Sequence, residues 1–181
     1  MLYYSLPNCE EARAHADHPD SHVEKLAACY REHPAWRDAA GWLSGDASSA
    51  VYFSHRPGEA WHLSQGNDGA VLQPGSADDP DLAFCFTPAA IERVASVQGG
   101  IGDFAVALFE CITSEDPELR VGFRVVAPLT RLLRRGYVGL MLAAGPKVAA
   151  YGARHGIRTL AQLRRLVQQS RAAGPAAWEV P

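Results

Sequence analysis

The spacing of apolar residues changes along this chain, and that change limits its fold more than any other feature. Residues 8–43 carry apolar side chains at helical spacing, with interruptions at Pro19 and Pro34. Residues 49–73 alternate around two glycine-containing turns, which predicts two or three short antiparallel strands. Residues 82–86 form the clearest strand of the sequence. We therefore expect helices followed by a sheet whose first strands are joined by hairpins.

The second half of the chain returns mainly to helical spacing. Thr87 is expected to cap a helix that begins at Pro88, and residues 103–112 predict a strongly apolar helix after it. Residues 119–125 alternate as a half-buried strand does. Further helices are expected over residues 128–142, 147–155 and from Thr159 onward. The expected fold class is α+β: a mainly antiparallel sheet of about five strands covered by helices, with extra N- and C-terminal helices.

Length and composition fit one globular domain. The chain has 181 residues, of which 48% are hydrophobic and 20% charged, which excludes a disordered chain or a disulfide scaffold. We divide it into an N-terminal helical segment over residues 1–48, an α+β core over 49–145 and a C-terminal helical extension over 146–181, packed as one domain. The sequence contains neither a signal-peptide pattern at its start nor an apolar run long enough to span a membrane. These features predict a soluble, cytoplasmic protein.

Charge is divided unevenly along the chain. Residues 1–118 hold 6 basic and 19 acidic side chains, a net charge of −13, whereas residues 119–181 hold 11 basic and one acidic, a net charge of +10. Two interpretations are open: the two halves pack together and neutralise each other, or a basic surface meets an anionic partner. The acidic half argues against nucleic acid, whereas a lipid surface needs only one basic face.

The segment that starts at residue 81 resembles the sterol carrier protein family, type two. In that family an Asp precedes an alternating apolar strand and a Ser or Thr then caps a helix, a pattern formed here by Asp81, Leu82, Phe84, Phe86 and Thr87. Residues 99–104 are similar to the turn between the family's two helices, and residues 119–125 to its last strand. The resemblance implies a mainly antiparallel sheet with helices on one face. It also implies an apolar cavity between them that binds sterols, fatty acids, acyl-CoA or isoprenoids.

Large apolar side chains in this region are candidates to line such a cavity. They are Phe84, Phe86, Ile91, Phe104, Leu108, Phe123, Leu133, Tyr137 and Met141. The same residues also fit an ordinary packed core. The first functional hypothesis is therefore that the protein binds an apolar lipid, such as a sterol, fatty acyl chain or isoprenoid, without catalysing a reaction. Transfer of that lipid is an extension of this hypothesis. The alternative is an interaction module or accessory subunit with a filled core that docks on a protein partner.

Two basic amphipathic helices are candidates for contact with a membrane or a protein partner. Residues 128–142 and 159–172 carry apolar faces beside Arg131, Arg134, Arg135, Arg164 and Arg165. Such helices suit an anionic membrane surface or a protein partner, although their apolar faces also suit packing on the sheet. No nucleic-acid partner is expected.

Other reactive side chains form no catalytic set in the sequence. His15, His18 and His22 share a helical spacing that suits a metal, but Pro19 interrupts that helix and argues against the site. Cys29 and His33 are four residues apart, which would suit a thiolate–imidazole pair, yet no third group to orient them is identifiable. We therefore predict no catalytic residue, no metal and no cofactor.

Two smaller features are interpreted as structural. Asp78, Asp79 and Asp81 flank a proline and are expected to be solvated loop carboxylates. Cys85 lies in an apolar run and is expected to be a small buried hydrophobic residue.

Overall fold

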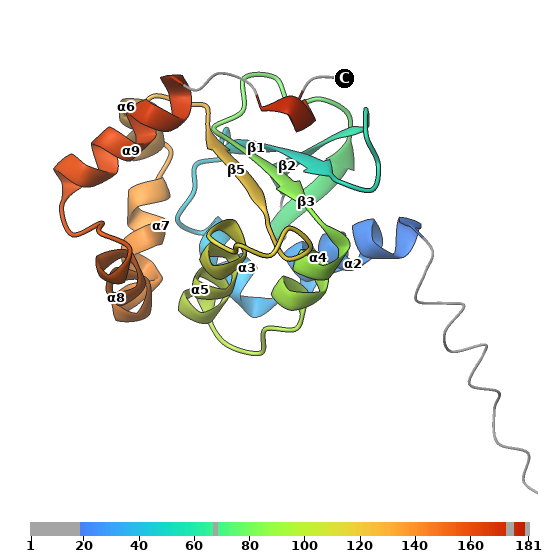
Figure 1. Cartoon of the computed structure of the whole chain (residues 1–181), viewed down its shortest axis with the longest axis horizontal. Coiled ribbons are helices and arrows are strands. Elements are labelled where there is room, and N and C mark those ends of the chain that lie inside the picture. The colour runs from blue at the N-terminus through green and yellow to red at the C-terminus, as the bar shows by residue number, and fades with distance from the viewer. Residues whose placement is uncertain (1–18, 67–68, 173–175, 180–181) are drawn as a thin grey trace, which may run out of the picture.

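A five-stranded sheet forms the centre of the molecule (Figure 1). The computed structural model describes residues 19–66, 69–172 and 176–179. The strands are β1 (Ser48–Phe53), β2 (Ala60–Gly66), β3 (Gly69–Pro74), β4 (Leu82–Phe86) and β5 (Gly122–Val125), in the spatial order β3-β2-β1-β4-β5. The helix that the sequence predicts before Pro19 lies outside the described residues.

The sheet is mixed and mostly antiparallel, which confirms the predicted α+β class. The pairs β1–β2, β2–β3 and β4–β5 are antiparallel, whereas β1 and β4 are parallel. The parallel pair arises because the chain leaves the edge strand β3, crosses back over residues 75–81 and adds β4 to the free side of β1. The strand that the sequence marks most clearly, β4, therefore lies beside β1, the central strand of the sheet.

Helices cover one face of this sheet and continue beyond its β5 edge. They are α2 (Pro19–Glu32), α3 (Pro34–Ala40), α4 (Pro88–Ala95), α5 (Ile101–Ile112), α6 (Leu129–Arg134), α7 (Tyr137–Ala143), α8 (Gly145–Arg154) and α9 (Leu160–Ala172), with a short 3-10 helix η1 (Ala177–Glu179) near the end. None of the described helices is long and apolar enough to cross a membrane.

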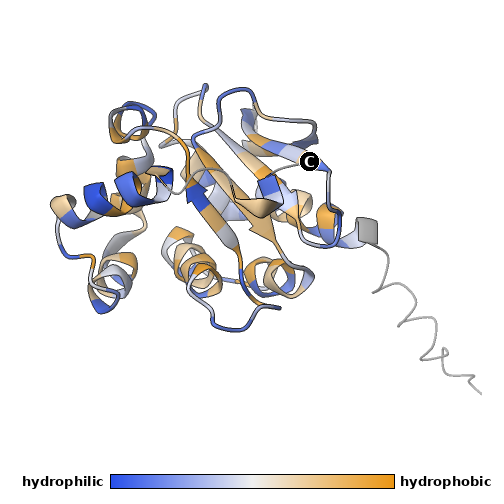
Figure 2. Cartoon of the chain, turned by 45° about the horizontal axis from the view of Figure 1, so that its top comes forward, coloured by the Kyte–Doolittle hydropathy of each residue, from blue (hydrophilic) through white to orange (hydrophobic). Residues whose placement is uncertain are grey.

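The main core lies between the sheet and helices α2 to α5. Alternate strand residues such as Val51, Phe53 and Phe86 point to the helical side, since successive side chains of a strand face opposite ways. Leu26 of α2 and Ile91 of α4 meet them and are fully buried. Figure 2 shows the hydrophobic colour concentrated on the strands and on the helices packed beneath them.

A second, smaller cluster joins the C-terminal helices to β5. Val125 of β5, Leu132 of α6 and Val167 of α9 are buried together with Ala127. Helix α9, at the left of both views, is otherwise largely hydrophilic (Figure 2). The extension therefore packs on the core at two places: α9 through this apolar strip at β5, and α8 through the buried Val148 and Tyr151 against α5.

Two helix starts follow the sequence prediction closely. Thr87 caps α4, where its hydroxyl accepts a hydrogen bond from the backbone of Ala90 at 3.2 Å. Thr159 caps α9, where its hydroxyl accepts from the backbone of Gln162 at 3.3 Å and Gln162 Oε1 accepts from the backbone of Thr159 at 2.9 Å.

The single helix expected over residues 128–142 is wrong. The chain forms α6 and α7 instead, separated at Gly136, whose φ of 87° belongs to the left-handed region. A side chain at Gly136 would overlap the carbonyl oxygen of Trp42, so the break lets the loop after α3 approach closely. The strand expected over 119–125 is also shorter than predicted, because only residues 122–125 pair with β4.

Candidate functional site

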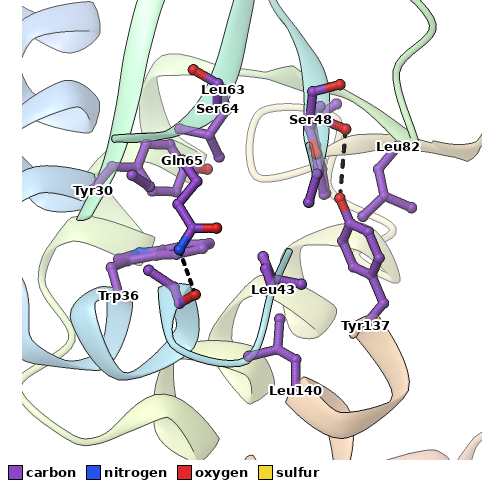
Figure 3. A pocket seen from close by; sticks show the side chains of 15 residues that line it. Tyr30, Trp36, Leu43, Ser48, Leu63, Ser64, Gln65, Leu82, Tyr137 and Leu140 are labelled. Carbon is purple, nitrogen blue, oxygen red and sulfur yellow. Dashed lines mark hydrogen bonds between the residues drawn. The ribbon is translucent and has the colours of Figure 1, made fainter. Parts of the chain in front are cut away.

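A pocket of about 140 Å³ lies between the helical face of the sheet and helices α2, α3 and α7 (Figure 3). Its walls are mainly apolar. The strands contribute Ser48, Ser49, Leu63, Ser64, Gln65, Ala70, Leu82 and Phe84, and the helices contribute Tyr30, Trp36, Ala40, Tyr137 and Leu140. The loop between α3 and β1 completes the lining with Leu43 and Ala47.

Polar groups stand on two opposite sides of this pocket. In Figure 3 the Gln65 amide lies on one side and the Tyr137 hydroxyl on the other, with Leu43 and Leu140 between them. Gln65 Nε2 donates a hydrogen bond to the carbonyl oxygen of Ala40 at 2.8 Å. The lining contains no Lys, Arg, His, Asp or Glu side chain. The pocket is therefore neutral, with polar atoms only at its edges.

Behind Tyr137 lies a buried ion network centred on Asp81. The Asp81 side chain is fully buried, with Arg135 Nη1 at 2.8 Å and Arg131 Nε at 3.1 Å from Oδ1. Tyr137 donates its hydroxyl proton to Oδ2 at 3.2 Å, and the backbone nitrogen of Ser48 donates to the same oxygen at 3.3 Å. Burial raises the pKa of Tyr137, so its hydroxyl stays protonated and can donate this hydrogen bond.

The backbone of Asp81 is bonded as fully as its side chain. Its nitrogen donates to the carbonyl oxygen of Ser48 at 2.8 Å. Its carbonyl oxygen accepts from the backbone nitrogens of Val126 and Ala127 at 2.9 and 3.0 Å. One residue thus joins β1, β4, the end of β5 and, through the two arginines, α6.

The expectation of a solvated acidic loop is wrong for Asp81 alone, since Asp78 and Asp79 are both exposed. Asp81 is buried, and Asp79 pairs with Arg131, whose hydrogen bond lowers the pKa of Asp79. Asp78 alone is an exposed carboxylate with no ion pair among the described residues. The spacing of Arg131 and Arg135 could have predicted a buried acidic partner, because side chains four residues apart on a helix lie on the same face and can reach one carboxylate.

The five predicted contact arginines separate into two groups. The side chains of Arg131 and Arg135 are only 15% and 12% exposed and belong to the internal ion network. Arg134, Arg164 and Arg165 are exposed on the surface. Contact of these five arginines with a membrane or a protein partner stays a prediction.

The nine predicted lining residues are distributed over three environments. Phe84 and Tyr137 line the pocket. Phe86, Ile91 and Phe104 are buried in the main core, and Leu108 packs against that core. Phe123, Leu133 and Met141 are 36%, 47% and 39% exposed, because they lie on the edge strand and on the outer sides of α6 and α7.

Sequence reasoning missed the part of the pocket that precedes residue 81. Trp36, Leu63 and Gln65 lie in α3 and β2, upstream of the segment that resembles the sterol carrier family. The alternation of side chains along β2 could have identified Gln65 as a lining residue, since it is two residues after Leu63 and faces the same side of the sheet.

Cys29 and His33 do not form a catalytic pair. His33 caps α3, where its Nδ1 accepts from the backbone of Ala35 at 3.1 Å, and its Nε2 lies 2.8 Å from the carbonyl oxygen of Val97. Both ring nitrogens are therefore occupied, and burial raises the pKa of Cys29 to about 11. The described residues contain no group of three His, Cys, Asp or Glu side chains that could hold a metal, and His15 and His18 lie outside them.

Fold and pocket define a small α+β protein with a neutral, apolar pocket between a mostly antiparallel sheet and the helices on one of its faces. No family model and no curated protein matches the chain. It is similar to a solved structure described as "UbiJ-SCP2 Ubiquinone synthesis protein", with 14% identity and a TM-score of 0.40, over 77% of this chain and 96% of that chain. At this level of similarity, function has to be inferred from the residues of the pocket itself.

Proposed function

We propose that this protein binds an apolar lipid-like ligand, without catalysing a reaction, in the pocket between the sheet and α2, α3 and α7. The observation that carries the proposal is the neutral lining, in which Leu63, Leu82, Phe84 and Leu140 surround a space of about 140 Å³. A dry engineered cavity of about 150 Å³ is large enough for a benzene molecule. The pocket therefore suits one ring or a short stretch of hydrocarbon.

A sterol, fatty acyl chain or isoprenoid is larger than this space, since sites for whole ligands of that size usually measure about 300–1,000 Å³. Helix α7 is the element best able to give way, because none of its side chains is fully buried. Its displacement would enlarge the pocket toward the exposed Leu133 and Met141. In this proposal Phe84 and Tyr137 contact the part of the ligand that lies inside the pocket, and Leu133 and Met141 cover its outer part.

Native mass spectrometry of the purified protein, followed by organic extraction, tests the proposal directly. We expect a co-purifying apolar molecule, and a ligand present at a hundred times its dissociation constant should stabilise the fold by about 2.7 kcal/mol. Ala70→Leu on β3 should weaken binding by filling the pocket, whereas Val71→Leu, on the exposed side of the same strand, is the matched control. A ligand-free mass with no thermal shift across a lipid panel would instead favour the interaction module with a filled core.

The source of the ligand is proposed to be an anionic bilayer. Trp42 and Leu142 are 52% and 77% exposed, and Trp42 lies against Gly139 of α7, the helix that also carries Leu142 and the exposed Met141. Arg134 is exposed at the end of the neighbouring α6, and no carboxylate occurs from residue 120 to 178. This combination favours anionic headgroups over an acidic or neutral protein surface.

Sedimentation with vesicles distinguishes this surface from a protein-docking one. Binding should rise with the fraction of phosphatidylglycerol in phosphatidylcholine vesicles and fall with salt. Leu142→Ser should reduce it, whereas Val71→Ser, an exposed change on the distant strand β3, should not. If the protein stays in the supernatant at every lipid composition, the bilayer is not its partner.

A further inference from the structure

The Gln65 side chain is held so that its amide oxygen has no partner. Its Nε2 donates to the carbonyl oxygen of Ala40 at 2.8 Å. A carbonyl oxygen only accepts hydrogen bonds, so this contact fixes the nitrogen toward α3 and leaves Oε1 on the other side. Figure 3 shows this oxygen directed toward the space between Gln65 and Tyr137. It is buried and has no hydrogen-bond donor among the described residues.

A buried donor without a partner belongs to the same wall. Trp36 lines the pocket beside Gln65, and its Nε1–H is buried with no acceptor among the described residues. Its ring is fixed between Tyr30 and Phe104, with centroids 4.4 and 4.8 Å away. Buried polar groups are almost always hydrogen-bonded in folded proteins, and leaving one unpaired costs free energy. Two neighbouring residues of this wall therefore carry an unused acceptor and an unused donor.

No other polar group of the pocket pairs with Gln65 Oε1 or Trp36 Nε1 among the described residues. The Tyr137 hydroxyl donates to Asp81 on the opposite side. No cationic side chain lines the pocket, so a buried carboxylate or phosphate would lack a counter-charge and could not donate to Gln65 Oε1. A hydroxyl group, in contrast, is neutral, donates one hydrogen bond and accepts others.

We infer that the pocket selects a neutral apolar ligand whose buried end carries a hydroxyl group, recognised by Gln65 Oε1 with Trp36 Nε1 as the second contact. The inference rests on the proposed function, because it specifies the chemistry of the ligand that the same pocket would bind. It excludes ligands that enter with a carboxylate or phosphate group first. A fatty acid could then bind only with its acid group outside the pocket.

Phenol and toluene are the probes for this inference, since each has one ring of a size that fits and only phenol carries the hydroxyl. Ligand-observed NMR titration gives the dissociation constant of each. We expect the unmodified protein to prefer phenol, and Gln65→Met, which keeps the volume but removes the acceptor, to reduce that preference about fivefold. Toluene binding should change less than twofold, and benzoate should not compete with either probe.

Gln73→Met on the exposed side of β3 is the matched control and should keep the phenol preference. Trp36→Phe removes the Nε1 donor together with part of the indole ring, and it provides a second test if Gln65→Met does not fold, with toluene binding as the readout of the change in volume. An unchanged phenol preference in the variant that folds overturns the inference, as does equal binding of phenol and toluene by the unmodified protein. If the unmodified protein binds neither probe, the proposed function fails, and the inference fails with it.

Discussion

At Asp81 one buried carboxylate connects residues that are far apart in the sequence. Arg135 and Arg131 approach it from α6, Tyr137 from α7 and the backbone of Ser48 from β1. A charge removed from water in this way is stable only while its partners remain, because loss of one partner leaves the opposite charge beside it less compensated. The pocket wall at Tyr137 therefore depends on a residue that does not itself line the pocket.

Replacement of this carboxylate should strongly destabilise the fold. Asp81→Asn keeps the shape of the side chain but removes the charge that faces two buried guanidinium groups, so we expect a loss of about 3 kcal/mol in the free energy of unfolding. Urea denaturation followed by circular dichroism measures it. Asp78→Asn, an exposed change in the same loop, should stay within about 0.5 kcal/mol of the unmodified protein. A loss below about 1 kcal/mol for Asp81→Asn would contradict the role given to this network.

The described cysteines should resist alkylation in the folded protein. Burial raises the pKa of Cys29 and of Cys85 to about 11, and it also raises the pKa of Cys111. At pH 8 only about one thiol in a thousand of the first two is ionised, and the thiolate is the reactive form. Iodoacetamide labelling read by peptide mass spectrometry should therefore modify these three sites slowly, and rapidly once the protein is unfolded in urea. Native labelling of Cys85 at the unfolded rate would show that it is not the buried residue that the sequence and the structure both indicate.

At the scale of helices and strands, the features that depend on neighbouring residues were predictable from the sequence, whereas those that depend on contacts between distant residues were not. The Thr87-Pro88 cap and the alternation over residues 82–86 depend on neighbours in the sequence, and both are confirmed. The break at Gly136 depends instead on the approach of Trp42, almost a hundred residues away in the chain. Asp81 escaped prediction for the same reason, since its partners in α6 and α7 lie about 50 residues further on. Of the nine residues expected to line a cavity, only Phe84 and Tyr137 lie in the pocket, because much of its remaining wall is formed by long-range pairing of β2 with β1 and β3.

The link between α6 and α7 should tolerate no side chain at its glycine. Gly136→Ala would place a Cβ against the Trp42 carbonyl oxygen at a positive φ, and we expect a loss of about 1–3 kcal/mol in the free energy of unfolding. Gly41→Ala is the matched control, because Gly41 has a helical φ of −64° and its Cβ would make only an ordinary contact. Denaturant unfolding of both variants checks this, and equal stability would mean that the loop after α3 moves aside freely.

For the molecule as a whole, the uneven charge along the sequence is explained in part by pairing between the two halves. Arg131, Arg135 and Lys147 of the basic half meet Asp79, Asp81, Asp46 and Asp103 of the acidic half. Packing therefore neutralises part of the asymmetry, as the first interpretation of the sequence proposed. The exposed Arg134, Arg164 and Arg165 remain available for an anionic partner.

This arrangement predicts how stability should change with acid. The hydrogen bond from Ser44 and the charge of Arg135 lower the pKa of Asp46, and the hydrogen bond from Arg131 lowers that of Asp79. Both carboxylates stay ionised in the folded protein at a pH where the unfolded chain already binds protons. Their contribution is therefore complete above the ordinary carboxyl pKa of about 4 and is lost as the pH falls below it.

Thermal unfolding between pH 7 and pH 3 tests this expectation. The melting temperature should change little down to about pH 5 and fall below about pH 4. The double variant Asp46→Asn/Asp79→Asn should melt lower at neutral pH but lose less on acidification, so that the two curves converge near pH 3. Asp38→Asn, an exposed change on α3, should follow the unmodified protein throughout. Parallel curves for the double variant would show that these two ion pairs contribute nothing to the dependence of stability on pH.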